Sequence, residues 1–139
     1  MNYRQEYEKW LASPALSEEE RNELKAIAND EKEIENRFYG PLEFGTAGLR
    51  GTMYTGLHNM NRHVIRWATQ GFANVIRAEG AEAMQKGVAV CMDCRNHSAE
   101  FARETACVMA ANGIHVRLFE SLRPTPELSF AVREYGCQA

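Results

Sequence analysis

Apolar side chains in the first third of the chain recur at helical spacing. Between residues 2 and 12 they fall on one helical face: Tyr3, Tyr7, Trp10 and Leu11. The sequence SEEE at 17–20 is a capping box, which predicts a second helix that ends at about residue 29. Asp30 and Glu33 predict a third helix, which ends near Phe38, before the helix-breaking sequence YGP. We therefore expect a charged helical extension over residues 1–40 that carries no chemistry of its own.

Two longer helices are predicted in the remainder of the chain, over residues 61–80 and 98–113. Asn61 is a suitable N-cap for the first helix, whose apolar stripe continues to a terminating glycine. Ser98 is expected to cap the second helix, and Gly113 to end it.

Two short apolar runs, VAVCMD at 88–93 and IHVRLFE at 114–120, predict strands, the first of them buried on both faces. A last helix follows over PTPELSFAVREYG, with its limits set by Thr125 as N-cap, Pro126 at the first helical position and Gly136 at the end. The order from residue 88 is strand, helix, strand, helix, which predicts a right-handed βαβ unit. The predicted fold class of residues 41–139 is therefore α/β, with an incomplete parallel or mixed sheet and flanking helices.

The end of this alternation is unusual. A helix closed by glycine normally leads into another strand, but only three residues follow Gly136. We therefore expect the sheet to be interrupted and the sequence to be the front part of a larger protein. An interrupted sheet leaves an open edge, so we also expect marginal stability or self-association through the strand IHVRLFE or its neighbour.

The stretch FGTAGLRG at 44–51 is the strongest chemical signal in the sequence. Its glycines allow the backbone to approach a ligand closely, and the guanidinium of Arg50 matches the oxygens of a phosphate. This combination indicates a loop that holds an anion, although a tight turn with a surface arginine is the simpler alternative. A dinucleotide site is discounted, because the spacing is not G-x-G-x-x-G and no clear buried strand precedes it.

Composition narrows the class of protein. The 139 residues carry a net charge of −3, which argues against a nucleic-acid partner bound through a broad basic surface. No run of about 18 apolar residues is present, so no membrane partner is expected. Cys91 and Cys94 form a lone C-x-x-C without the further ligands of a zinc site, and Cys91 belongs to an apolar run. We expect a cytoplasmic protein with reduced thiols.

Four segments, in order, resemble the α-D-phosphohexomutases, and in particular the long-form bacterial phosphoglucomutases. EFGTAGLRG resembles the family signature F-G-T-x-G-x-R-G, and NMNRHVIRWATQGFANVI resembles the helix that follows it. VAVCMDCRNHSAEFA matches the family motif D-x-R-x-x-S at Asp93, Arg95 and Ser98. LRPTPELSFAVREYGC resembles the segment just before the catalytic loop. The resemblance runs from about Tyr3 to the end of the chain.

The resemblance implies an enzyme that interconverts glucose 1-phosphate and glucose 6-phosphate. In such enzymes a phosphoserine gives its phosphoryl group to the sugar, glucose 1,6-bisphosphate forms, and the other phosphate returns to the serine. Mg²⁺ neutralises the developing charge. The implied partner is a phosphosugar, bound in a cleft between four domains.

Several family motifs are absent from these 139 residues. The sequence contains neither the serine motif T-A-S-H-N-P nor the metal loop D-G-D-x-D-R. The resemblance therefore implies a first domain that ends before the catalytic serine loop, with the Mg²⁺ ligands elsewhere and no mutase activity in this chain alone. A stand-alone, non-catalytic α/β module that binds phosphate or a partner stays open as the alternative.

The resemblance also bears on individual residues. It implies that Arg50 contacts phosphate in the cleft, whereas Thr46 and Gly48 shape the loop or serve structure alone. Asp93 and Arg95 follow a predicted parallel strand, at the sheet edge where ligands bind. An ion pair that fixes the turn is nevertheless the preferred interpretation of these two residues, and a helix cap that of Ser98. No role is assigned to the histidines.

Overall fold

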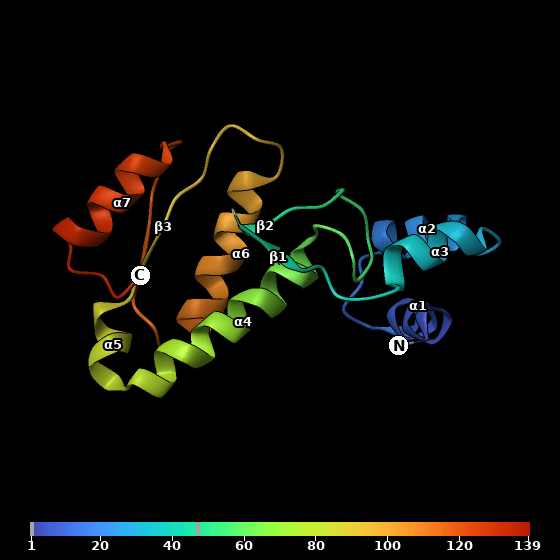
Figure 1. Ribbon diagram of the computed structural model, residues 1–139, viewed down its shortest axis with the longest axis horizontal. Helices are drawn as coiled ribbons and strands as arrows, with labels where there is room; N and C mark the ends of the chain where they lie inside the picture. The colour runs from blue at the N-terminus through green and yellow to red at the C-terminus, as the bar shows by residue number, and fades with distance from the viewer. Residues whose placement is uncertain (1, 47) are drawn as a thin grey trace. The chain divides into compact units, whose positions relative to one another are not determined.

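A computed structural model describes residues 2–46 and 48–139 (Figure 1). Ala47, within the glycine-rich stretch, lies outside the described residues. The chain divides into two compact units, residues 1–64 and 65–139, and each unit is described by itself. The predicted boundary between residues 40 and 41 stays a prediction.

Three short helices form the core of unit 1. They are α1 (Tyr3–Ala12), which the apolar spacing predicted, and α2 (Glu18–Ala26) and α3 (Glu31–Phe38), which the capping patterns predicted. The capping box is confirmed, because the Ser17 hydroxyl accepts from the Glu20 N–H while the Glu20 carboxylate accepts from the Ser17 N–H. The second helix is shorter than predicted. Apolar side chains from all three helices and the α1–α2 connection pack together: Tyr7, Leu16, Leu24, Ile34 and Phe38.

The glycine-rich stretch forms a small antiparallel hairpin in the same unit. Strands β1 (Phe44–Gly45) and β2 (Gly48–Leu49) pair with Phe44 opposite Leu49 and Gly45 opposite Gly48. Residues 52–61 then lead to α4 (Arg62–Glu79). The predicted cap of α4 is confirmed, because the Asn61 side-chain oxygen accepts from the N–H groups of His63 and Val64.

Unit 2 contains the predicted βαβ arrangement. After α4 and the unpredicted short helix α5 (Ala81–Lys86) come β3 (Val88–Val90), α6 (Ser98–Ala111), β4 (Val116–Leu118) and α7 (Thr125–Glu134). The two strands pair in parallel, with Val88 opposite Val116. In Figure 1, α6 lies to one side of β3 and α7 to the other, and both helices contact it. The core of the unit joins helices and strand: Ala73, Ile76, Ala83, Val88, Met109 and Ile114.

Both strands are shorter than the apolar runs that predicted them. Only residues 88–90 of VAVCMD form β3, and only Val88 of the three is buried, so burial on both faces was wrong. Beyond Val90 the backbone bonds elsewhere, since the Met92 carbonyl accepts from the Arg123 N–H. The hydrogen-bonded ladder therefore ends before the apolar run does.

The caps of α6 and α7 also differ from the prediction. His97, in a left-handed conformation with φ of 62°, precedes α6, and Ser98 is its first residue. The Ser98 hydroxyl instead accepts from the Asp93 N–H at 3.0 Å, so the helix-cap prediction for Ser98 was wrong. In α7, Pro124 takes the N-cap position and Thr125 is the first helical residue. The ring of Pro124 restricts its φ, and the residue has the extended backbone conformation of an N-cap. The helix therefore begins one residue earlier than predicted, at Thr125.

Strand β3 is hydrogen-bonded along both edges. Val88 and Val90 bond to the β4 side, through the His115 carbonyl and the Phe119 N–H. On the opposite side the Gly87 carbonyl accepts from the Gln138 N–H, and the Ala89 N–H donates to the Ala139 carbonyl. Alternate backbone groups of a strand point to opposite edges. The residues after α7 therefore already lie alongside the edge of β3 opposite β4.

Candidate functional site

Arg50 stands immediately after the hairpin, in exposed backbone. Its guanidinium makes no hydrogen bond, ion pair or ring contact with the residues that the structure describes. Other arginines of unit 1 are engaged with carboxylates or carbonyls: Arg4, Arg21, Arg37 and Arg62. Arg50 is thus a fixed positive charge with all its donors available, which is the property that a phosphate-binding arginine needs.

The hairpin brings this arginine close to two of the other predicted residues. Thr46 is exposed at the turn, and Gly48 begins β2 with φ of 89°. A side chain at position 48 would meet no atom within 4 Å, but an L residue rarely adopts that φ. The glycine is therefore required by the backbone of the hairpin, which supports a structural role at this position.

The second candidate group lies in unit 2, at the carboxyl end of β3. Arg95 donates to the Asp93 carboxylate from both Nε and Nη2 at 2.7 Å, and the Arg95 N–H donates to the same carboxylate at 3.0 Å. The predicted ion pair is confirmed. With the Ser98 hydroxyl on the Asp93 N–H, these three residues tie the turn that leads into α6.

This turn has a clear electrostatic signature. The side-chain and backbone N–H groups of Arg95 lower the pKa of Asp93 from 3.8 to about 2. The same carboxylate raises the pKa of the Arg95 guanidinium. Because the donors of Arg95 are directed to Asp93, this pair acts first as a lock on the turn.

Unit 1 contains polar contacts that the sequence did not predict. The Tyr39 hydroxyl lies 2.5 Å from Nε2 of His58, and His63 contacts Glu20. Glu23 and Arg37 form a partly buried ion pair. Arg37 also pairs with Glu33, four residues before it on the same helical face, and this spacing is the one signal in the sequence of a contact in this group. The others join residues 14 to 43 positions apart, which periodicity does not reveal.

Metal, thiol and membrane chemistry find little support in the described part of the chain. Within it, no three histidine, cysteine, aspartate or glutamate side chains gather where they could hold a metal ion. The four cysteines are free, and partial burial and Asp93 raise the pKa of the Cys91 thiol. Over residues 2–46 and 48–139 the helices are too short or too polar to cross a membrane.

The matching protein family is phosphoglucomutase/phosphomannomutase, alpha/beta/alpha domain I, and it matches residues 41–139. This range includes the hairpin with Arg50 and the turn with Asp93 and Arg95. It leaves helices α1 to α3 outside the matched residues.

Curated proteins with similar sequences are sugar-phosphate mutases by name. The chain is 37% identical to the phosphopentomutase of Homo sapiens over 136 residues, 92% of this chain and 22% of that protein. It is 38% identical to the phosphoglucomutase of Staphylococcus saprophyticus over 109 residues, 78% of this chain and 19% of that protein. Identity to the phosphomannomutase of Mycoplasma pneumoniae is 30% over 132 residues, 94% of this chain and 24% of that protein.

The chain spans about a fifth of the length of the curated relatives it matches. No solved structure matched it.

Proposed function

The chain belongs to the phosphoglucomutase/phosphomannomutase family, and we propose that it forms domain I of an enzyme that interconverts glucose 1-phosphate and glucose 6-phosphate. The observation that carries the proposal is Arg50, whose guanidinium has no partner among the described residues and follows a hairpin matched by the family. A phosphosugar mutase needs a fixed cation at the phosphate that is transferred.

In the proposed reaction a phosphoserine gives its phosphoryl group to the sugar, and glucose 1,6-bisphosphate forms. The sugar then returns its other phosphate to the serine. Arg50 binds oxygens of the phosphate that faces it, through one or two N–H donors, and so lowers the cost of its negative charge. The hairpin contributes a short, glycine-rich backbone that leaves room for the phosphate.

Neither the phosphoserine nor a metal site is assigned to this chain. Its sequence has no T-A-S-H-N-P or D-G-D-x-D-R motif, and the described residues offer no cluster of metal ligands. We propose that Mg²⁺ is held by other parts of the enzyme. The chain alone is proposed to be inactive, and the location of the enzyme to be cytoplasmic.

The choice of sugar substrate can be tested directly. The sequence identity of this chain to a phosphopentomutase, 37%, is close to its identity to a phosphoglucomutase, 38%. The test compares glucose 1-phosphate with ribose 1-phosphate on the intact enzyme, in coupled assays that detect each 6- or 5-phosphate product. We expect a higher kcat/KM for glucose 1-phosphate, and no turnover by the 139-residue chain. A higher kcat/KM for ribose 1-phosphate would show that the substrate is a pentose phosphate. If the intact protein turns over neither sugar, the alternative of a non-catalytic binding module is supported.

A further inference from the structure

The hairpin that presents Arg50 is attached to the stretch of chain that follows it. Residues 52–61, here called the support segment, begin two residues after Arg50. They bond to Leu42, two residues before β1, and internal bonds hold their own first residue, Thr52. The Leu42 N–H donates to the Leu57 carbonyl at 3.2 Å, and the Met60 N–H donates to the Thr52 carbonyl at 2.8 Å. The Asn59 side chain also donates to the Thr52 hydroxyl at 2.6 Å. The position of the hairpin therefore follows that of the support segment.

The support segment is in turn bound to α2 through Glu23. The Thr55 N–H and hydroxyl both donate to the Glu23 carboxylate, at 3.1 and 2.5 Å. Thr55 is only 3% exposed, so these groups have no ready substitute in solvent. Hydrogen bonds to a charged acceptor are stronger than neutral ones. Glu23 thus fixes the middle of the segment.

Arg37 on α3 holds the same carboxylate from the other side. It lies 2.5 Å from Glu23 and 2.7 Å from Glu33, and its guanidinium stacks 4.3 Å from the ring centre of Tyr54. Its side chain is 7% exposed. A charge so buried needs partners, because loss of one leaves an uncompensated charge away from water. The arginine therefore joins α2, α3 and the support segment into one network.

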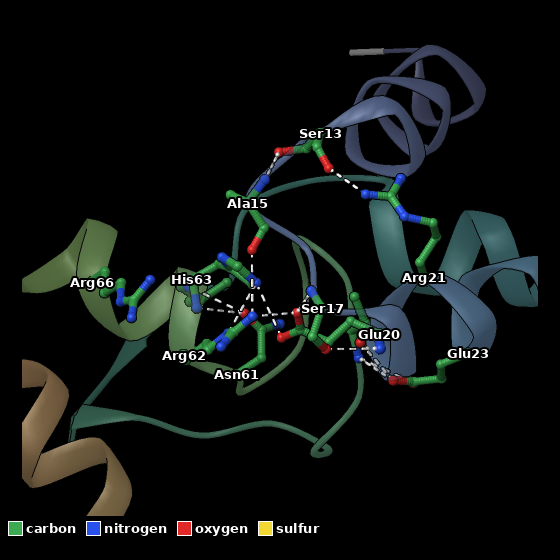
Figure 2. Close-up of polar contacts among 12 residues, drawn as sticks. Ser13, Ala15, Ser17, Glu20, Arg21, Glu23, Asn61, Arg62, His63 and Arg66 are labelled. Atoms are coloured by element: carbon green, nitrogen blue, oxygen red, sulfur yellow. Dashed lines mark hydrogen bonds and ion pairs between the residues drawn. The ribbon is translucent and has the colours of Figure 1, made fainter.

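Glu20, one turn before Glu23 on α2, holds the first two residues of α4, which directly follow the segment (Figure 2). Its carboxylate lies 2.7 Å from Arg62 and 3.1 Å from His63. Burial raises the pKa of Glu20, but hydrogen bonds from the Ser17 backbone, Arg62 and His63 outweigh it and lower the pKa overall. Residues three apart lie on the same face of a helix. One face of α2 thus holds the middle of the support segment at Thr55 and the start of α4 directly after it.

The backbone of the segment also lies directly against α3. The His58 N–H donates to the Arg37 carbonyl at 2.9 Å. At Gly56, with φ of 153°, an added Cβ would lie 2.9 Å from Cβ of Arg37. Glycine is needed at position 56 because the support segment and α3 approach each other so closely there.

We propose that Glu20, Glu23 and Arg37, here called the anchoring cluster, are positioning residues that set the place of Arg50 through the support segment. This inference rests on the proposed function of Arg50 as a phosphate ligand. All three residues precede position 41, where the family match begins. The N-terminal helices, for which the sequence indicated no chemistry, thereby serve the phosphate site.

The test first measures backbone hydrogen exchange in this chain without ligand. Glu23→Gln replaces an oxygen acceptor by an amide donor that faces the donors of Thr55 and Arg37, and Thr55→Val removes only the hydroxyl. Glu31→Gln is the matched control, since the Glu31 carboxylate pairs with Arg4 on α1. Thr55→Ser keeps the hydroxyl and should restore the wild-type behaviour.

We expect both Glu23→Gln and Thr55→Val to raise exchange at the Leu42 and Met60 amides about tenfold or more, as loss of a charged hydrogen bond allows. Amides of α1, which belongs to the same unit as the substitutions, should be unchanged, which shows that this unit stays folded. Unchanged exchange at Leu42 and Met60 in a folded Thr55→Val protein would overturn the proposal.

The second measurement separates positioning from stability alone. NMR titration with glucose 1,6-bisphosphate should give a dissociation constant about three- to tenfold weaker in the two variants than in the two controls. Binding that is equal in all five proteins would overturn the proposal while the phosphate site stands. If the wild-type chain binds no bisphosphate, the proposed function of Arg50 fails, and the exchange rates alone decide whether the anchoring cluster positions the hairpin.

Discussion

At the scale of single residues, the partners of an arginine side chain determine its role. Arg50 and Arg95 both follow short strands and both belong to family motifs, yet their surroundings differ. Arg95 is directed to Asp93, whereas Arg50 has no partner among the described residues. The sequence anticipated the Asp93–Arg95 pair because the two residues are two apart in a turn. It could not anticipate the contacts of Glu23, since Thr55 is 32 residues away.

The Asp93 pair gives a prediction for pH. Because the pKa of Asp93 is lowered from 3.8 to about 2, its contribution to stability is fully present above about pH 4 and is lost as the pH falls toward 2. Arg95→Gln should raise the pKa toward the ordinary value. The pKa is measured by NMR, from the chemical shift of the Asp93 carboxyl carbon as a function of pH.

The matched control for that titration is Arg103→Gln, on the exposed face of α6. It should leave the pKa of Asp93 at about 2. An unchanged pKa in Arg95→Gln would show that the ion pair is not its main cause.

At the scale of elements, helices were easier to predict than strands. The caps at Ser17, Asp30 and Asn61 are local patterns, and the structure confirms each of them. Strands β3 and β4 have three residues each and are shorter than the apolar runs that predicted them. The sequence predicted an open edge on the strand IHVRLFE or on its neighbour. For the neighbour, β3, this was wrong, because residues 138 and 139 form hydrogen bonds along its second edge.

This second edge of β3 gives a prediction for stability. Gln138→Pro removes the N–H that binds the Gly87 carbonyl, and the loss should lower the free energy of unfolding by about 1–3 kcal/mol. Gln138→Ala keeps the N–H and loses only an exposed side-chain contact with Glu79, so it should cost less than about 0.5 kcal/mol. Urea unfolding of both variants compares the two values, and equal values would show that the last residues do not act as a strand.

At the scale of the whole molecule, the chain consists of two units with different contents. Unit 1 contains the three N-terminal helices and the hairpin that precedes Arg50, and unit 2 contains a two-stranded parallel sheet with its helices. The order of four family motifs in the sequence predicted the α/β class and the family, and both are confirmed. The support of the hairpin was not predictable, because buried ion pairs between distant segments leave no periodic pattern.

Arg50→Ala in the intact enzyme tests whether Arg50 binds the phosphate of a sugar substrate. Loss of this charge-assisted contact is expected to cost about 2–4 kcal/mol, or roughly 30- to 1,000-fold in kcat/KM. Arg50→Lys should recover only part, because the fork of donors is lost. The melting temperature should hardly change, since an exposed arginine contributes little to stability.

The control is Arg103→Ala, which removes an exposed arginine from α6 and should leave kcat/KM near the wild-type value. Both quantities are measured on the same purified proteins. We expect a large fall in kcat/KM and an unchanged melting temperature in Arg50→Ala relative to the wild-type enzyme. Normal kcat/KM in a folded Arg50→Ala enzyme would contradict it.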